Sequence, residues 1–586
     1  MSFESVPSHV TAGAPSDDSR VRAASTDATR YLCAAAYLDE SFARRVLDEV
    51  LHQPHRAVAP SYGIDLVPIV RHCLEGRRRL FVRDLVVTGA LAVLLVVAVA
   101  QGVVLALAAL TLWLGFQGVR SLQQRSVNAA AVLLVLAGLS ALLLAGALNR
   151  TGALGYGGAY PSEEAGAGGA WWWILGLLVV WGAYFSYRLS VHRIVSTQLT
   201  PSAFPSARLP VASPAHEQRL SYLDQAQRGN VTVYSSDWAV RPFIGSGAVM
   251  TEWNLVTPLR PAQIHLPGTT PPGAALKGTD EPDGAGGSAA GPAPLDAHLL
   301  YERARQGIVA LGHPGLPPHE RIHQLSVQDR VFVAGILPAG SPFLDERRRP
   351  VFRLHPSAIE AVDRAERGEV RHYQTVRMAA WRGELEVTGF LYVAVRGGML
   401  FVEFVATQLP SLRPRYHAID TYERFNARVG LLAGVGAIGD LVQCLGAPLS
   451  AGRWLAETVR LGLDPSYQSR PSREIERQLA YDYGARTSVR ELGTQFSASA
   501  RFQDYDANER VSLVERRILE VVVNTLQVQG YDVSDLAGQA TTIINNSTVV
   551  GGSIAGTGIS VGAGAHSFVG PGARGASSQE ARAQST

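Results

Sequence analysis

The sequence contains very little lysine and little charge for its length. Lys277 is the single lysine among 53 basic residues, and 18% of the 586 residues are charged, whereas soluble domains average about 25%. The charge deficit therefore favours a membrane protein over a wholly soluble one. The net charge of +3 is too small for a chain of this length to indicate a nucleic-acid-binding protein.

Cysteine is also scarce. The three cysteines, Cys33, Cys73 and Cys444, are far apart and lack the spacing of metal ligands. This pattern argues against a disulfide framework and against a zinc ribbon. It is typical of reduced cytoplasmic thiols.

The segment from Met1 to Thr29 has no apolar core, which predicts that no signal peptide opens the chain. Residues 1–26 are expected to be a disordered N-terminus. Apolar residues are instead concentrated between Leu85 and Tyr187, so internal segments are expected to drive membrane insertion.

Leu85 to Gly118 is one long apolar run without an ionisable side chain. It is too long for a single span, which needs about 20 residues. The polar pair Gln101-Gly102 divides it, which predicts a transmembrane hairpin at residues 84–119 with helices at about 84–100 and 103–119. The alternative is a wedge-like hairpin that enters and leaves one leaflet.

Residues 128–188 predict two further spans. Ala129–Leu148 is an uninterrupted apolar run, and Trp171–Tyr187 begins with three tryptophans, which suit a membrane interface. The glycine-rich segment 149–170 between them is expected to be an external loop.

Arginines predict the orientation, because cytoplasmic loops are enriched in them. They cluster before the first span, between the second and third, and after the fourth: Arg77, Arg78, Arg79, Arg83, Arg120, Arg125, Arg188 and Arg193. With four spans, all of these clusters face one side. Both termini are therefore expected to be cytoplasmic, with the chain in the plasma membrane.

The four predicted spans contain no ionisable residue in their interiors. Such residues usually mark ion or proton pathways. An oligomeric transporter or channel is therefore only an alternative interpretation of this region.

The regions next to the spans read as a cytoplasmic helical segment at 27–83 and a linker at 201–220. Apolar residues recur with a helical period between Leu38 and Leu51, and a second helix, Ile64–Leu80, leads into the first span. Prolines at 201, 205, 210 and 214 predict the linker.

Residues 221–425 predict a cytoplasmic α+β domain. Val231–Val233 and Val331–Val333 read as strands, and an antiparallel meander follows at 373–379, 384–395 and 399–407, with a hairpin turn at Arg396-Gly397-Gly398. Residues 267–294 are rich in Gly, Pro and Ala and predict a disordered insertion. The expected fold class is thus α+β, with four transmembrane helices in two hairpins.

Residues 426–535 read as a helical region. Val429–Leu445 is apolar but contains Asp440, and it predicts a buried or membrane-surface helix rather than a fifth span. Asp506 to Glu509 resembles a capping box before an apolar stripe from Val511 to Thr525 that ends at Gly530. The Gly-rich tail, 541–586, is compatible with solenoid-like rungs, with a strand added to a partner's sheet, or with a flexible tail.

His319-Glu-Arg-Ile-His323 matches a zinc-peptidase pattern, in which a helix would place His319 and His323 on one face with Glu320 as general base. Pro314, Pro317 and Pro318 crowd its start and disfavour that helix. A zinc-dependent hydrolase is therefore an alternative, and no catalytic or cofactor-binding set is predicted.

Gly434-Val-Gly-Ala-Ile-Gly439 matches a dinucleotide fingerprint, but Pro448 shortens the helix that such a site requires. Close packing of helices explains these glycines better.

The segments Val233–Gly247, Asp329–Gly335 and Arg371–Thr388 resemble an uncharacterised group of actinomycete (Streptomyces-like) multi-pass integral membrane proteins with a "VYSG…PFVGSG" element. The resemblance implies origin and topology but no activity. The expected function is a non-enzymatic, membrane-anchored scaffold or sensor. Its expected partners are the lipid bilayer and a protein bound by the cytoplasmic domain or the tail.

Overall fold

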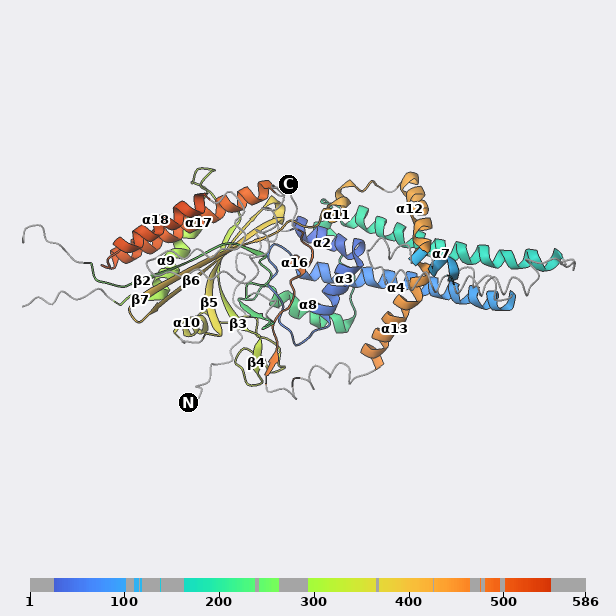
Figure 1. Ribbon diagram of the computed structural model, residues 1–586, viewed down its shortest axis with the longest axis horizontal. Coiled ribbons are helices and arrows are strands. Elements are labelled where there is room, and N and C mark those ends of the chain that lie inside the picture. Colours follow the sequence, from blue (N-terminus) through green and yellow to red (C-terminus); the bar gives the residue numbers. More distant parts are fainter. Residues whose placement is uncertain are drawn as a thin grey trace, which may run out of the picture.

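The computed structural model describes residues 26–101, 110–114, 116–117, 138, 163–237, 242–262, 294–364, 368–424, 426–463, 475, 480–495 and 501–549. Most of the second predicted span, nearly all of the third, the insertion 267–293, the N-terminal segment 1–25 and the tail beyond 549 lie outside these residues. Figure 1 shows three parts along the longest axis: a sheet with its helices, a helical bundle, and a projecting pair of long helices.

The bundle begins with α2 (Thr26–Leu38), α3 (Glu40–Val46) and the π-helical turn η1 (Leu47–Leu51). The sequence predicted one helix over 38–51, and the structure adds α2 and a break at Asp39. Asp39 ends the run because it caps α3, accepting a hydrogen bond from the backbone N–H of Phe42.

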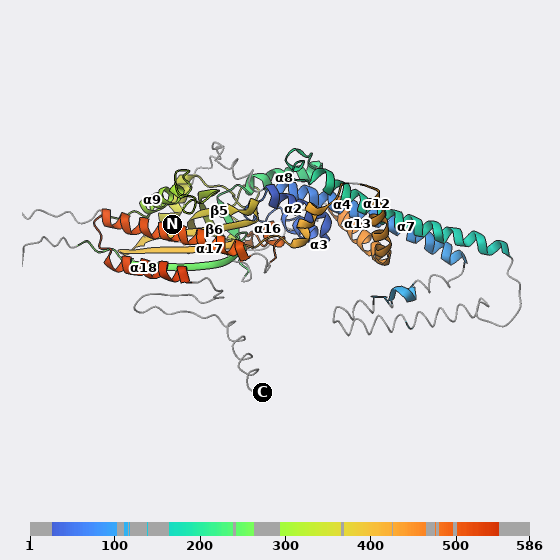
Figure 2. The same cartoon turned by 90° about the horizontal axis from the view of Figure 1, so that it is seen from above.

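Two helices of 36 residues each project from the bundle. Helix α4 (Leu66–Gln101) joins the expected cytoplasmic helix to the first predicted span without a break, which confirms that the two are continuous. Helix α7 (Glu163–Gln198) includes the fourth predicted span and also takes in the end of the expected external loop. The two helices lie side by side in both views (Figures 1 and 2).

Two helical stretches in the described part of the chain are long and apolar enough to span a membrane, by length and composition alone. They are Trp173–Gln198 and Ala427–Ala456. The sequence predicted four spans and excluded the second of these stretches, so the four-span prediction is not reproduced. Helix α4 carries exposed apolar residues beyond Asp84, among them Val93 and Val96.

A short turn, η2 (Phe204–Ser206), and helix α8 (Pro214–Ala226) follow α7. The structure therefore differs from the predicted linker, whose second half is helical. Ser213 caps α8, and Pro214 occupies its first turn, where the missing N–H of proline costs nothing.

The α+β domain contains a mixed sheet of six strands in the order β1-β3-β5-β6-β7-β2. Strand β1 pairs parallel to β3, and the other neighbours are antiparallel. The strands are β1 (Val231–Tyr234), β2 (Ala248–Pro258), β3 (Leu325–Ala334), β5 (Val370–Ala380), β6 (Leu385–Arg396) and β7 (Met399–Leu409). This confirms the α+β class and the meander, and Gly397 and Gly398 form the turn with φ of +56° and +71°.

Helices α9 (Ala297–Ala310), α17 (Arg501–Val528) and α18 (Ser534–Val549) cover one face of the sheet, and Figure 2 shows α17 and α18 beside it. The apolar stripe of α17 is buried at Val511, Val514, Ile518 and Val522, as expected. The capping-box prediction is wrong, because α17 starts at Arg501 and contains both Asp506 and Glu509. Helix α18 also takes in the start of the Gly-rich tail.

Shorter elements complete the described chain. They are β4 (Ile336–Pro338) paired with β8 (Ala480–Asp482), α10 (Pro356–Arg364), η3 (Trp381–Gly383), α11 (Pro414–His417), η4 (Ala418–Thr421), α12 (Ala427–Asp440), η5 (Leu441–Gly446), α13 (Ala447–Leu463) and α16 (Val489–Leu492). The segment from α11 to η4 returns to the bundle, where Tyr416 and Ile419 join its core.

Candidate functional site

A cavity of about 430 Å³ opens between the start of α9, the end of α10 and the adjoining ends of β5 and β6. Charged and aromatic side chains line it, including Asp363, Arg364, Arg371, His372, Tyr392 and Arg396. Small-ligand pockets usually measure about 300–1,000 Å³, and this cavity lies in that range although its lining is more polar than is usual. We therefore take it as the candidate site.

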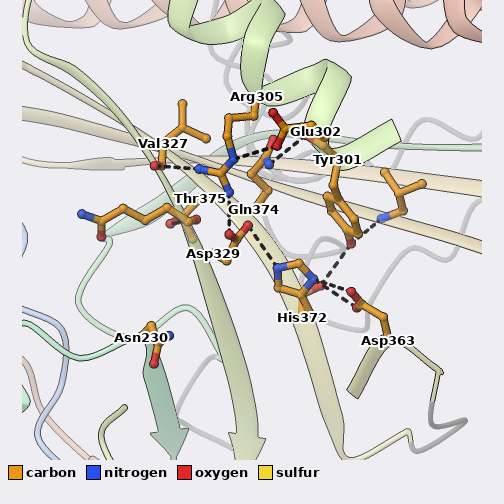
Figure 3. A network of polar contacts seen from close by, with 12 residues as sticks. Asn230, Tyr301, Glu302, Arg305, Val327, Asp329, Asp363, His372, Gln374 and Thr375 are labelled. Carbon is orange, nitrogen blue, oxygen red and sulfur yellow. Dashed lines mark hydrogen bonds and ion pairs between the residues drawn. The ribbon is translucent and has the colours of Figure 1, made fainter. Parts of the chain in front are cut away.

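His372 on β5 lies at the inner wall of this cavity, and only 4% of its side chain is exposed. Its Nδ1 atom lies 3.0 Å from both carboxylate oxygens of Asp363 on α10. Its Nε2 atom lies 3.3 Å from Oδ1 of Asp329 on β3. The imidazole ring is thus held between two carboxylates, as Figure 3 shows.

Helix α9 supports this arrangement from above the sheet. Arg305 donates to Oδ2 of Asp329 at 2.5 Å and to the carbonyl of Val327 at 3.2 Å. The hydroxyl of Tyr301 donates to the carbonyl of His372 and accepts from the backbone N–H of Val393. These contacts fix the position of His372 relative to the strand next to it (Figure 3).

Burial alone would lower the pKa of His372. The hydrogen bonds to Asp329 and Asp363 outweigh it and raise the pKa to about 8. For Asp329, burial opposes ionisation, but the hydrogen bond from His372 and the charge of Arg305 lower its pKa. At neutral pH the site therefore contains an imidazolium between two carboxylates.

This protonation state limits the chemistry of His372. Both ring nitrogens donate to carboxylates, so neither is free to accept a proton from a bound molecule. The two carboxylates lie on opposite sides of the ring and do not converge on one point. In the described part of the chain no group of three or more His, Cys, Asp or Glu side chains could hold a metal ion. The arrangement suits ligand binding and positioning more than acid–base catalysis.

The cavity is lined by three arginines and three carboxylates: Arg364, Arg371, Arg396, Asp296, Glu360 and Asp363. Arg364 pairs with Glu360 at 3.1 Å. The side chains of Arg364 and Arg371 are 78% and 51% exposed, and Arg396 is also exposed. Arg371 also lies over the ring of Tyr392, 5.8 Å from its centroid, and 3.8 Å from the carboxylate of Glu403. Guanidinium groups at a polar rim favour ligands with a carboxylate or phosphate.

The two predicted metal candidates do not belong to this cavity. His319 lies in a turn and is 75% exposed, and His323 lies in the loop before β3. The helix that the zinc-peptidase pattern would need is absent from this described segment, where the three prolines before His319 leave only turns. The ring of His319 lies 3.8 Å from the carboxylate of Glu320, and it does not face His323 from the next helical turn.

The glycines of the dinucleotide-like pattern lie on α12 and contact α7. Gly434 faces the rings of Trp181 and Phe185, and a Cβ atom at Gly436 would overlap the guanidinium of Arg188. Gly434 and Gly436 thus lie at the packing surface between α12 and α7, as expected from the sequence, whereas a Cβ atom at Gly439 would meet open space.

The sequence did not identify His372, Asp329 or Asp363 as a group. Asp329 and His372 lie within segments that carried the family resemblance, but no spacing links them, because β3 and β5 are brought together by the sheet register.

A second polar site involves the Gly245-Ser-Gly247 turn. The backbone N–H groups of Gly245 and Gly247 donate to the Glu491 carboxylate at 3.0 and 3.1 Å. Both glycines have a φ of +90°, which requires glycine. This contact gives Gly245 and Gly247, which belong to the "VYSG…PFVGSG"-like element, a structural role.

The comparisons with known proteins bear on the same region. No curated protein and no solved structure matches the chain. The model of the AbeC-like domain matches residues 252–559, which are 308 of the 586 residues. This match begins inside β2 and includes β3 to β7 and the α17–α18 pair, as well as the candidate site. The chain therefore belongs to the family defined by the AbeC-like domain.

Proposed function

We propose that the chain is a non-enzymatic, membrane-anchored sensor or scaffold. In this proposal the AbeC-like domain faces the cytoplasm and binds a small anionic ligand in the cavity beside His372. The long helices anchor it to the plasma membrane.

The main support for the membrane anchor is that α4 runs without a break from the bundle into an exposed apolar segment. The first part of the helix is packed in the bundle, where Ile69, Val70 and Cys73 are buried. The same helix then continues into a segment whose apolar side chains are exposed, such as Val93 and Val96 at 55% and 70%. A soluble protein rarely exposes such a row, and lipid would cover it.

Coupling between the bundle and the sheet supports a sensor. Asp39 accepts from Arg413 at 3.0 Å and from the Tyr416 hydroxyl at 2.8 Å. Arg413 and Tyr416 follow β7 directly, so a buried carboxylate ties the helices at the membrane to the end of the meander. A change at the sheet would then reach α4 through packed contacts.

The four-span topology belongs to the proposal. Arginines at 77–79 and 83 on α4, and at 188 and 193 on α7, lie at the bundle end of both helices. Both of these ends are therefore proposed to be cytoplasmic, which needs an even number of crossings between them. A wedge at 84–119 would meet this requirement as well. We also propose that this chain comes from an actinomycete and is related to the membrane-protein group that its sequence resembles.

Cysteine labelling tests the anchor and its orientation. Val211 is 92% exposed and Val309 is 54% exposed, so Val211→Cys and Val309→Cys each offer an accessible thiol. We expect an impermeant maleimide to label both only after cells are permeabilised, and the protein to stay in the membrane pellet after an alkaline carbonate wash. Labelling in intact cells, or release by carbonate, would contradict the proposal.

Thermal unfolding of the purified full chain tests the ligand. Phosphate, sulfate and citrate serve as probes, and we expect at least one to raise Tm. The increase should be lost in Arg396→Gln, which removes a rim cation, and kept in Arg347→Gln, which changes an exposed arginine outside the cavity. Equal responses of both variants would show that the cavity is not the anion site.

No specific observation favours the other two interpretations, which are a zinc-dependent hydrolase and an oligomeric transporter or channel. The His319–His323 segment lacks the helix that a zinc hydrolase would need, and no described feature favours transport.

A further inference from the structure

Helices α12 and α13, with η5 between them, carry a continuous row of exposed apolar side chains. Leu431, Val435, Ile438 and Leu449 are 69%, 59%, 58% and 74% exposed. Val442 on η5 continues the row at 42%. Leu431, Val435, Ile438 and Val442 follow a helical period and so lie along one face, and Leu449 is exposed on α13 beyond η5.

The opposite face packs on the two long helices. Ala437 and Ala447 are buried against Val87 of α4 and Val180 of α7. The indole N–H of Trp181 donates to the carbonyl of Gly434 at 3.0 Å. The rings of Phe81 and Trp454 stack with their centroids 3.6 Å apart. The segment is therefore fixed in place and its apolar row points outward.

Two polar contacts fix the position of the α12–α13 segment along the axes of α4 and α7. The hydroxyl of Ser450 donates to Asp84, the last ionisable residue of α4 before the apolar stretch. The carboxylate of Asp440 pairs with Arg188, the first ionisable residue of α7 after its apolar stretch. The segment thus lies where both long helices change from polar to apolar.

The direction of the segment excludes a crossing alongside α7. In Figure 1 α12 and α13 run across the paired α4 and α7, and η5 bends the path between them. If the long helices follow the membrane normal, this segment lies along the membrane plane. Its length and composition alone would have suggested a span.

Cations are exposed at the same level. Arg428 at the start of α12 is 74% exposed and lies 3.7 Å from Glu423, and Arg78 on α4 is 76% exposed and lies 3.9 Å from Glu75. Arg453 on α13 is also exposed. The nearby carboxylates of Asp84 and Asp440 are already paired. An amphipathic segment with exposed cations fits a surface of anionic lipid headgroups.

We propose that residues 427–456 form an interfacial collar, lying in the headgroup layer of an anionic bilayer with the apolar row directed into the acyl chains. The inference rests on the proposed membrane anchor. The collar, which lies within the AbeC-like domain match, would hold the six-stranded sheet of that domain at a fixed distance from the membrane.

Depth measurements by spin labelling test the collar. Leu431→Cys and Leu449→Cys place nitroxides at its two ends, Val93→Cys places one on the apolar part of α4, and Val528→Cys places one on α17, far from the membrane. All four are made in the full chain with Cys444→Ala and reconstituted into nanodiscs of phosphatidylcholine and phosphatidylglycerol. Collisions with oxygen and with a nickel chelate then report the depth of each label.

We expect the two collar labels at one shallow depth, Val93→Cys deep in the bilayer and Val528→Cys in water. A crossing helix would separate positions 431 and 449 by up to about 27 Å in depth, which would overturn the collar. Collar labels in water together with a deep Val93→Cys would overturn the collar alone. A water-exposed Val93→Cys label would overturn the membrane anchor as well.

Discussion

Arg188 and Asp440 form a two-pronged ion pair between α7 and α12, with Nε–Oδ2 and Nη2–Oδ1 distances of 2.6 and 3.0 Å. They are 252 residues apart in the sequence. The pair fixes the rotation of α12 about its axis, and so determines which of its faces is exposed.

A double-mutant cycle on this pair tests its contribution. We expect Arg188→Ala and Asp440→Ala each to destabilise the protein by on the order of 1 kcal/mol, because parallel hydrogen bonds strengthen a partly exposed pair. The double variant should be no less stable than either single one. Thermal unfolding in detergent gives the ranking, and fully additive losses would contradict a direct interaction.

The protonation of His372 predicts a pH dependence of stability. Its pKa is raised from 6.5 to about 8 in the folded protein, so its stabilising effect is complete below about pH 6.5 and is lost as the pH rises through 8. The shift corresponds to on the order of 2 kcal/mol.

His372→Gln should remove this slope between pH 6.5 and 9. The pKa of His417 is also raised, by its hydrogen bond to Glu384, which outweighs burial. We therefore expect His417→Gln to keep the His372 part of the slope. Denaturant unfolding at several pH values measures it, and an unchanged slope in His372→Gln would rule out the assigned ion pairs.

Adding a single methyl group at Gly247 should strongly lower the stability of the protein. It has a φ of +90°, and a Cβ atom there would overlap the carbonyl oxygen of Gln408. We expect Gly247→Ala to cost at least about 2 kcal/mol. Gly397 also has positive φ but open space around it, so Gly397→Ala is a matched control that should cost about 1 kcal/mol. Equal losses in both would mean that the close approach at Gly247 is unimportant.

The Asp39 carboxylate predicts a large effect of a small change. It is 5% exposed and faces Arg413, Arg415 and the Tyr416 hydroxyl. We expect Asp39→Asn to destabilise the chain by on the order of 2 kcal/mol, because it removes the charge that accepts from Arg413, Arg415 and the buried Tyr416 hydroxyl. Glu40→Gln breaks an exposed pair with Arg44 and should cost under about 0.5 kcal/mol. Comparable Tm values for the two variants would count against Asp39 as the link.

Metal analysis tests the histidines before β3. We expect the purified chain to show the same zinc content as His319→Ala and His323→Ala, because these side chains are not arranged on a helix. Stoichiometric zinc that disappears in both variants would restore the hydrolase interpretation.

The strands of the meander were predictable because their residues alternate in part and a Gly-Gly turn joins two of them. The partial alternation indicated one exposed face, whereas β5 and β6 are buried on both faces along most of their length. Strand β2 also alternates, with Trp253, Leu255 and Thr257 buried, but its partner β7 lies far along the chain and its polar residues obscured the pattern. Helix α18 was missed for another reason. Its β-branched residues favour strands, while Leu536 and Ala540 are buried against the core of the sheet and its helices.

The site could not have been predicted in the same way. Asp363 contacts His372 from α10, and Asp329 contacts it from the neighbouring strand β3. Neither contact is reflected in a local periodicity of the sequence. The cavity likewise depends on how α9 and α10 meet the ends of β5 and β6. Local patterns determine elements, whereas the site arises from their tertiary arrangement.

The contact between Asp39 and Arg413 joins residues 374 positions apart. During synthesis at about 5–20 residues per second, roughly 20–75 s separate their emergence from the ribosome. Part of the core around α2 and α3 therefore stays exposed until β7 and the segment that contains Arg413 have been synthesised. Throughout that interval the nascent protein exposes surface that chaperones recognise, and truncation before Arg413 would leave that surface permanently uncovered.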